Sequence, residues 1–400
     1  MRLWVPFGRR RVVGVLVETR DRSDLPDAKL KAALGVIDDE PVFDEPLLEL
    51  LRWSADYYRH APGEVIAAAL PAALRAGASM LETTERWTLT AAARTDQLPP
   101  LPGRANRLRE LAEILRGRES ADAAELAAFS PRWRDHAREL EKRGWIARLR
   151  VAEQTPARGE VRTSQGLEPT PEQRTAIEAI AAASGAFAPF LLHGVTGSGK
   201  TEVYLRAIEA VVARGEQALV LVPEIALTPQ LVARFAQRFD APLAVLHSSL
   251  PDQERLRAWR AARSGTAPVV IGTRSAIFAP LARPGLIVVD EEHDPSYKQQ
   301  EGFRYSARDL ALVRAQRLAI PVVLGSATPS LESLERVRAG KATLLSLPNR
   351  TAGASQPTLH LIDLRKHGET QGIATPTLFA IKRHLEAGGQ VLLYLNRRGY

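Results

Sequence analysis

Short runs of apolar residues alternate with longer stretches of helical periodicity in the second half of the chain. The five runs occupy residues 190–193, 218–222, 269–272, 286–290 and 322–325. Such alternation is typical of a parallel sheet whose strands are joined by crossover helices. The pattern predicts an α/β domain over residues 169–348.

The first 76 residues have a different pattern. Residues 11–18 form a β-like run, and residues 47–58 form a helical stretch. The pattern predicts a small β-rich domain over residues 1–76. Two polar segments, the Pro-rich residues 94–105 and residues 152–168, are typical of linkers.

Between these linkers, three helical segments are followed by a short strand. The second helix is expected over residues 121–129 with Ser120 as its cap, the third over residues 132–143, and the strand over residues 145–151. This order predicts a winged helix within residues 77–151. The third helix of a winged helix often faces DNA. Many winged helices dock proteins instead, so both interpretations stay open.

Composition limits the class of protein. The 400 residues carry 54 Lys and Arg against 46 Asp and Glu, a formal charge of +8 that suits a polyanion or reflects a bias toward Arg codons. No apolar run approaches the roughly 20 residues of a membrane span, and the N-terminus lacks a signal core. A cytoplasmic, nucleoid-associated protein without a membrane partner is expected. With no cysteine, the chain has no disulfide or thiolate metal site.

The most specific motif lies between the first apolar run and a predicted helix over residues 202–212. Its sequence, GVTGSGKT, fits G-x-x-x-x-G-K-[ST] throughout. In this motif backbone N–H groups and the helix N-terminus face the phosphates, the lysine reaches the β- and γ-phosphates, and the hydroxyl binds Mg²⁺. The expected ATP-binding residues are Gly194, Val195, Thr196, Gly197, Ser198, Gly199, Lys200 and Thr201.

A second motif, DEEH, ends the apolar run at residues 286–290. An acid at the tip of such a strand suits Mg²⁺ held beside the phosphates, so Asp290 and Thr201 are the expected metal ligands. Glu291 is expected to orient and deprotonate the attacking water, and His293 to sense the γ-phosphate. With Lys200, these three residues form the expected catalytic set.

Further polar residues follow the other apolar runs. Ser326 and Thr328, in GSATP, are expected to couple the nucleotide site to the DNA-moving surface, and DEEH followed by SAT is diagnostic of a superfamily 2 helicase. Backbone-phosphate contacts to DNA are expected at Thr228, Gln230, Thr273 and Arg274. Gln173 resembles the glutamine that reads adenine, although T-x-x-Q alone is an ordinary helix cap.

Together these motifs resemble the bacterial primosomal replication-restart helicases, the PriA family. The strings that carry the resemblance are GVTGSGKTEVY (194–204), VPEIALTPQ (222–230), IGTRSAIF (271–278), DEEHDPSYKQQEGFRYSARD (290–309), LGSATPS (324–330) and LNRRGY (395–400). VPFG near the start and ADYYRHAPGEV (55–65) extend the resemblance over essentially the whole chain. The string after DEEH is not a general helicase feature.

The resemblance implies a RecA-like helicase lobe preceded by a 3′-DNA-end-binding domain and a winged helix. It implies an ATP- and Mg²⁺-dependent 3′-to-5′ DNA helicase acting on forked and single-stranded DNA. Single-stranded DNA-binding protein, primosome proteins and the replicative helicase loader are the implied partners, and a monomer is expected. Residues 296–305 match the family's aromatic-rich loop, in which Tyr297, Phe303 and Tyr305 offer stacking faces and Lys298 and Arg304 attract phosphate.

Both ends depart from the family pattern. A strand-rich segment is expected before VPFG, and paired CxxC zinc motifs and the rest of a second lobe are expected after residues 349–400. Zn²⁺ is therefore expected in the family although no ligand for it is present here. Two alternatives stay open: another superfamily 2 duplex translocase, and a DNA-binding fragment with little ATPase activity.

Overall fold

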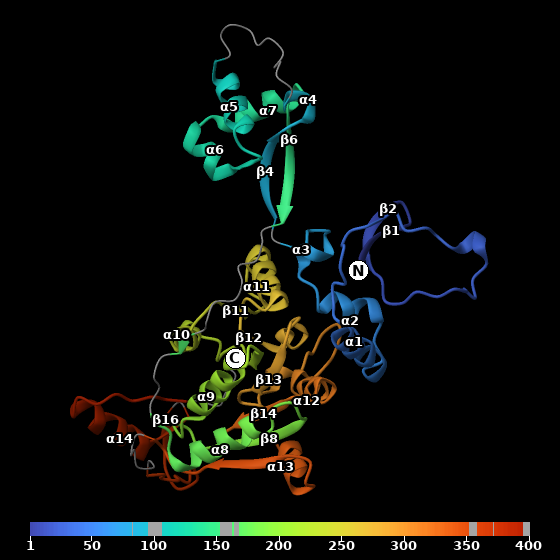
Figure 1. Ribbon diagram of the computed structural model, residues 1–400. Helices are drawn as coiled ribbons and strands as arrows, with labels where there is room; N and C mark the ends of the chain where they lie inside the picture. The colour runs from blue at the N-terminus through green and yellow to red at the C-terminus, as the bar shows by residue number, and fades with distance from the viewer. Residues whose placement is uncertain are drawn as a thin grey trace. The chain divides into compact units, whose positions relative to one another are not determined.

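The computed structural model has two compact units, residues 1–351 and residues 352–400 (Figure 1). The residues that the structure describes are 1–81, 83–94, 106–152, 162–163, 168–351, 358–370 and 372–394. Most of the expected linkers and the LNRRGY string lie outside them.

A seven-stranded, wholly parallel sheet is the centre of the first unit. Its strand order is β11-β12-β9-β13-β14-β8-β15. The strands are β8 (Ala188–Gly194), β9 (Gln217–Leu221), β11 (Leu243–Leu246), β12 (Val269–Gly272), β13 (Pro284–Val289), β14 (Pro321–Ser326) and β15 (Thr343–Leu347). The predicted α/β fold is confirmed. The five predicted runs are strands, and β11 and β15 were not predicted.

Helices cover both faces of this sheet. Alternate residues of β13 enter different cores: Ile287 and Val289 join one cluster, and Leu286 and Val288 join the other. Fully buried apolar runs of this kind are typical of parallel strands. The helices are α8 (Pro171–Ala182), α9 (Lys200–Ala213), α10 (Pro229–Arg238), α11 (Asp252–Ser264), α12 (Ala307–Leu318) and α13 (Leu331–Arg338), with the short 3₁₀ helices η2 (Arg274–Phe278) and η3 (Pro295–Tyr297).

The N-terminal module combines a small antiparallel sheet with three helices. The sheet has the order β2-β1-β3. The elements are β1 (Arg2–Phe7), β2 (Arg10–Val15), η1 (Asp27–Lys29), β3 (Gly35–Val36), α1 (Glu45–Tyr57), α2 (Pro62–Ala68) and α3 (Ala72–Arg75). Buried Arg2 anchors the sheet through a 2.6 Å ion pair with Asp38. The helices of this module share one hydrophobic core with the large sheet, so residues 1–81 and the helicase lobe are packed as one body.

The segment for which a winged helix is expected has its own core, built around Trp87, Leu111, Trp133 and Leu140. Its elements are β4 (Thr83–Leu89), α4 (Ala91–Arg94), α5 (Asn106–Arg116), β5 (Ala121–Asp122), α6 (Ala123–Phe129), α7 (Trp133–Lys142) and β6 (Ile146–Ala152), with the sheet order β5-β4-β6. The cap of the second helix is Asp122, not the expected Ser120: its carboxylate forms a capping box with Glu125.

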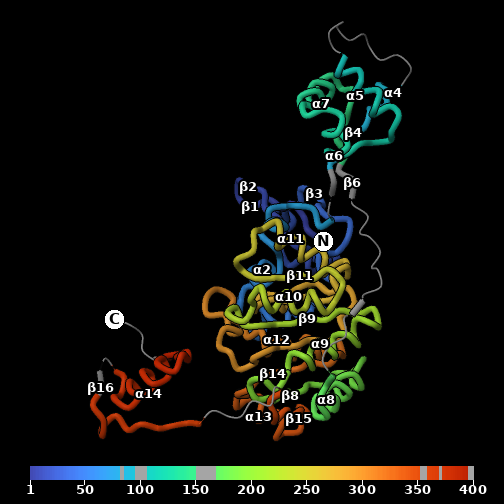
Figure 2. Tube along the Cα trace, turned by 90° about the vertical axis from the view of Figure 1, so that its left-hand side faces the viewer, coloured from blue at the N-terminus to red at the C-terminus, as the bar shows by residue number. Residues whose placement is uncertain are grey.

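The remaining described elements are short. β7 (Arg162–Thr163) pairs with β10 (Phe239–Asp240), and the second unit contains β16 (Glu369–Thr370), β17 (Ile373–Ala374) and α14 (Thr375–Glu386) (Figure 2). None of the described helices has the length and apolar character that crossing a membrane requires.

Candidate nucleotide-binding site

Three adjacent strands end together at the candidate site. In the sheet, β14 lies between β13 and β8, and the phosphate loop, DEEH and SAT follow the carboxyl ends of β8, β13 and β14. Ligands of open parallel sheets bind at this edge. The topology therefore brings together the three motifs that are separated along the sequence.

The loop between β8 and α9 has the backbone of a phosphate cradle. Gly197 and Gly199 both have φ = +81°, a region in which residues with a Cβ are strained. A Cβ on Gly199 would also lie 2.3 Å from Nε2 of Gln173. Lys200, at the first position of α9, directs its ammonium to the carbonyl of Gly194 at 3.1 Å. The hydroxyl of Ser198 is buried and has no hydrogen-bond partner in the described part of the chain.

Gln173 holds this loop. Its Nε2 donates to the carbonyl of Ser198 at 2.8 Å, and its Oε1 accepts from the N–H of Thr170 at 3.0 Å within a capping box. Only 3% of the residue is exposed. The expected role in reading adenine stays a prediction, and the structure adds a role in fixing the loop against the start of α8.

The acidic motif lies opposite Lys200. Nζ of Lys200 is 3.6 Å from Oε1 of Glu291, whose backbone has φ = +45°. A left-handed non-glycine residue costs roughly 1–3 kcal/mol, and such strain concentrates at functional sites. The turn sends the carboxylate of Glu291 toward the phosphate loop.

His293 connects DEEH to SAT. Its Nδ1 lies 2.8 Å from Oγ of Ser326, and its Nε2 lies 3.4 Å from Oγ1 of Thr328. The same Nδ1 is 3.7 Å from Oε2 of Glu291. A continuous polar chain therefore runs from the phosphate loop to β14, as the coupling role expected of Ser326 and Thr328 requires.

Tyr204 is a site residue that sequence reasoning missed. It lies one helical turn after Lys200 in α9, is 2% exposed, and donates its hydroxyl to Oδ1 of Asp290 at 2.9 Å. Burial raises the pKa of Asp290, and the hydrogen bond from Tyr204 lowers it. Gly325 makes room for the ring, because a Cβ there would lie 1.6 Å from the hydroxyl. Its spacing of four residues from Lys200 was the available signal.

Glu292 was also missed. This residue points away from the nucleotide loop, is 2% exposed, and accepts hydrogen bonds from the backbone N–H and hydroxyl of Ser330, from the hydroxyl of Ser333, and from Arg308. The hydrogen bonds span 2.7–3.3 Å. Glu292 thus ties DEEH to the starts of α12 and α13.

The expected DNA-contact residues fall into separate groups, because Thr273, Arg274, Phe303 and Tyr305 line one cavity and Thr228 and Gln230 do not. Thr228 and Gln230 are exposed at the start of α10, where Thr228 caps the helix. Thr273 is buried. Arg274 donates to the carbonyls of Ser296 and Lys298, at 2.7 and 3.3 Å. The guanidinium of Arg274 therefore holds the aromatic-rich loop in this structure.

The three rings of that loop are mostly buried, so the expectation of openly exposed stacking faces is wrong, although Phe303 and Tyr305 line a cavity. Tyr297, Phe303 and Tyr305 are 2%, 6% and 5% exposed and belong to the main core. The Tyr297 hydroxyl donates to the carbonyls of Leu221 and Asp290, which satisfies its polar group and permits burial. Lys298 and Arg304, between these rings in sequence, are exposed. Polar neighbours made the segment look like surface, although the rings alternate inward.

Comparison with known proteins gives two family matches. A DEAD/DEAH box helicase model matches residues 170–337, and a 3′DNA-binding domain (3′BD) model matches residues 1–71. Three curated relatives, each named replication restart protein PriA, match the whole of this chain over part of their own length. They come from Haemophilus influenzae (40% identical, 55% of its length), Bacillus subtilis (34%, 58%) and Treponema pallidum (36%, 50%).

The chain spans about half the length of these relatives. The two domain matches occur in the order found along the chain, first the 3′DNA-binding domain and then the helicase domain. The chain therefore belongs to the PriA family of replication restart proteins.

Proposed function

We propose that residues 169–348 bind Mg²⁺·ATP, and that the whole protein hydrolyses it as a DNA helicase in replication restart. One observation carries the proposal: Nζ of Lys200 in the phosphate loop lies 3.6 Å from Oε1 of Glu291, the residue after Asp290, and Glu291 lies 3.7 Å from His293. A phosphate-binding lysine, a candidate metal ligand and a candidate base thus meet at one sheet edge. This combination suits phosphoryl transfer, in which positioning and charge stabilisation dominate.

The residues take distinct roles in this proposal. The N–H groups of the glycine-rich loop and Lys200 would bind the phosphates, and Thr201 and Asp290 would hold Mg²⁺, which would supply neutralisation of phosphate charge. Glu291 orients and deprotonates the attacking water. His293 senses whether the γ-phosphate is present and transmits this to β14 through its contacts with Ser326 and Thr328. Gln173 contacts adenine while holding the loop.

The proposed contacts to DNA phosphates use exposed polar and charged groups rather than the buried rings. Thr228 and Gln230 at the start of α10, and Lys298 and Arg304 in the aromatic-rich loop, are exposed and suit phosphate contacts. Thr273 and Arg274 support the adjoining loops. The N-terminal module, matched by the 3′DNA-binding domain, contributes binding near a DNA 3′ end.

The finer functions belong to the whole protein. The whole protein would move 3′ to 5′ on forked and single-stranded DNA. Its partners would be single-stranded DNA-binding protein, primosome proteins and the replicative helicase loader. The relatives' name, replication restart protein, supports this assignment over another duplex translocase. For these 400 residues, which span about half the length of the relatives, DNA binding with little hydrolysis is the second candidate.

Two measurements test the proposal. Binding of a fluorescent ATP analogue to this chain should require Mg²⁺ and be lost in excess EDTA. The full-length protein should show ATPase activity that forked DNA with a leading-strand arm stimulates more than blunt duplex does. Nucleotide binding without Mg²⁺ dependence would contradict the site assignment, and equal stimulation by both DNAs would contradict the restart assignment.

A further inference from the structure

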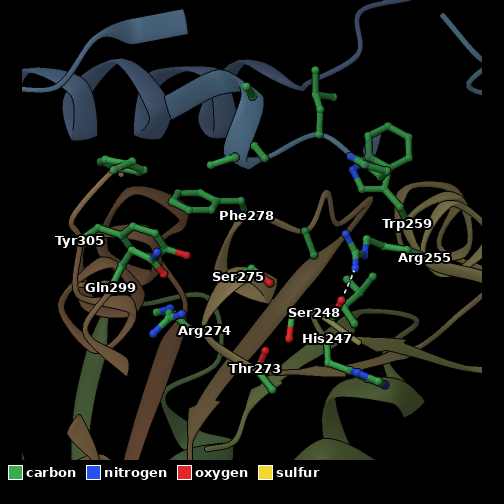
Figure 3. A pocket seen from close by; sticks show the side chains of 18 of the residues that line it. His247, Ser248, Arg255, Trp259, Thr273, Arg274, Ser275, Phe278, Gln299 and Tyr305 are labelled. Carbon is green, nitrogen blue, oxygen red and sulfur yellow. Dashed lines mark hydrogen bonds between the residues drawn. The ribbon is translucent and has the colours of Figure 1, made fainter. Parts of the chain in front are cut away.

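A second cavity lies at the same edge of the sheet, away from the nucleotide site. Its volume is about 610 Å³, within the range of pockets that hold small molecules. It is enclosed on one side by α2 and α3 of the N-terminal module and on the other by loops that follow β9, β11 and β12 (Figure 3). These two walls share one hydrophobic core, so the cavity is part of a single packed body.

Trp259 adds a buried indole N–H to the wall of the cavity. The residue is 2% exposed, and its Nε1 has no hydrogen-bond partner among the residues that the structure describes. A buried donor without a partner costs roughly 1–3 kcal/mol. Arg255 lies beside it, held in place by a 2.6 Å hydrogen bond from Nη2 to the carbonyl of Ser248 (Figure 3).

The polar lining combines donors and acceptors. Arg255, the Trp259 N–H and the hydroxyls of Thr273 and Ser275 donate, and the carboxylates of Glu224 and Glu301 accept. The lining holds three carboxylates, Glu64, Glu224 and Glu301, and three guanidiniums, Arg75, Arg255 and Arg274, so its formal charge is balanced and does not select a bare anion such as phosphate. A nucleobase presents amino donors and ring or carbonyl acceptors on one edge, which suits this mixture.

The apolar lining suits the face of a base. Phe278 and Tyr305 lie on the side opposite Trp259 and Arg255, as Figure 3 shows, and Ala68 and Leu70 come from the N-terminal module. Contact between a base and an aromatic or apolar wall does not depend on which base is bound. The cavity therefore fits a single unstacked base of any sequence.

Its position indicates how a strand would reach it. Thr273 lines the cavity at the end of β12, and Glu224 lines it four residues before Thr228. A strand whose phosphates follow the loops after β9 and β12 passes the mouth of the cavity. We propose that the cavity binds one unpaired DNA nucleotide, with its base inserted between α2 and Phe278. This inference rests on the proposed DNA binding and adds to it a position that binds a base of any identity.

The test separates base binding from phosphate binding. A labelled oligothymidylate, shortened to the minimum length that still binds, is compared by fluorescence anisotropy with versions carrying one abasic nucleotide at each position, without ATP. For the wild-type chain, one abasic position should raise Kd at least about fivefold, as loss of one stacked base does. The other positions should have smaller effects.

Two cavity-filling variants supply the comparison. Ala68→Phe enters from α2 and Ser275→Leu from the opposite wall, and both sites are exposed, so the fold tolerates the added volume. Each should weaken binding of the intact oligonucleotide by about the same factor and abolish the dependence on the abasic position. Ala76→Leu, an exposed alanine at the end of α3 that does not line the cavity, is the matched control and should behave as wild type.

The outcomes distinguish this inference from the proposed function. Wild-type binding that ignores every abasic position, or filled variants that keep the wild-type dependence, overturns the base site while DNA binding stands. Failure of the wild-type chain to bind any oligonucleotide, with ATP-analogue binding intact, overturns both the base site and the DNA-binding part of the proposed function.

Discussion

The two halves of one sheet edge differ in how far their functional side chains bond to one another, although the phosphate loop also keeps one buried hydroxyl, that of Ser198, without a partner among the described residues. After β8, β13 and β14, the functional side chains already bond to one another: Tyr204 to Asp290 at 2.9 Å, and His293 to Ser326 at 2.8 Å. After β9, β11 and β12, the cavity keeps the buried N–H of Trp259 without a partner among the described residues.

This difference indicates two kinds of binding. Catalysis of phosphoryl transfer requires charged groups fixed before the substrate arrives, because reorganising them during the reaction would raise the barrier. A site that accepts successive bases of any sequence must release each one, so it gains from apolar contact and from a few donors that the ligand satisfies. The nucleotide-binding half is therefore a connected network of hydrogen bonds, called here the rigid half, and the other half is an open cavity, called the open half.

The largest effect should come from the rigid half. Lys200→Ala removes the ammonium that lies 3.6 Å from Glu291 and faces the phosphates, so ATP hydrolysis by the full-length protein should fall at least about a hundredfold. Oligonucleotide binding should stay within about twofold of wild type, since the cavity is lined by other residues. Steady-state ATPase and anisotropy measure the two. Lys341→Ala, at an exposed lysine, is the control, and parallel loss of both activities would break the distinction between the halves.

A somewhat smaller effect is expected on stability. Glu292→Ala deletes a carboxylate that accepts from Ser330, Ser333 and Arg308; Arg308 keeps its bond to Asp309, but the donors of Ser330 and Ser333 lose this acceptor. The free energy of unfolding of the helicase lobe should fall by about 3 kcal/mol. Urea denaturation followed by circular dichroism measures it. Glu332→Ala, at a side chain 71% exposed, should change it by less than about 0.5 kcal/mol. An equal loss of unfolding free energy in both variants would show that the hydrogen bonds of Glu292 do not stabilise the fold more than an exposed carboxylate does.

The sequence predicted the rigid half far better than the open one. Strands with buried apolar runs and a glycine-rich loop carry their own signals, because each follows from local pattern and backbone freedom. β11 and β15 carried weaker signals: β11 has four residues, and β15 has three exposed positions out of five. Both became strands through pairing with distant neighbours, which no local window contains.

The direction in which each side chain points was the second feature that the sequence did not predict. Glu291 and Glu292 are identical neighbours in an acidic run, yet one faces Lys200 and the other faces Ser330. The left-handed backbone at Glu291 decides this, and residue type alone does not reveal it. The rings of the aromatic-rich loop followed the same rule. Tyr297 is buried because two backbone carbonyls happen to lie within reach of its hydroxyl.

The smallest effect is expected from the removal of a single hydroxyl in the nucleotide-binding half. Tyr204→Phe keeps the buried ring against Gly325 but removes the hydrogen bond to Asp290. Stability should fall by only about 1 kcal/mol, and the affinity for Mg²⁺ in the presence of the ATP analogue should fall severalfold, because the carboxylate loses its fixed orientation. Titration of Mg²⁺ at constant analogue concentration measures this change.

The pH profile gives that variant a signature that a purely structural defect lacks. Burial already raises the pKa of Asp290, and the Tyr204 hydroxyl opposes the rise by stabilising the ionised carboxylate. Without the hydroxyl the pKa rises further, so Mg²⁺-dependent analogue binding should be lost at a higher pH on acidification than in wild type. Tyr57→Phe, at an exposed tyrosine of α1, should leave the profile unchanged. A Tyr204→Phe profile that overlays wild type would mean that Asp290 is oriented by its backbone alone, and the nucleotide half would be less interdependent than its hydrogen bonds indicate.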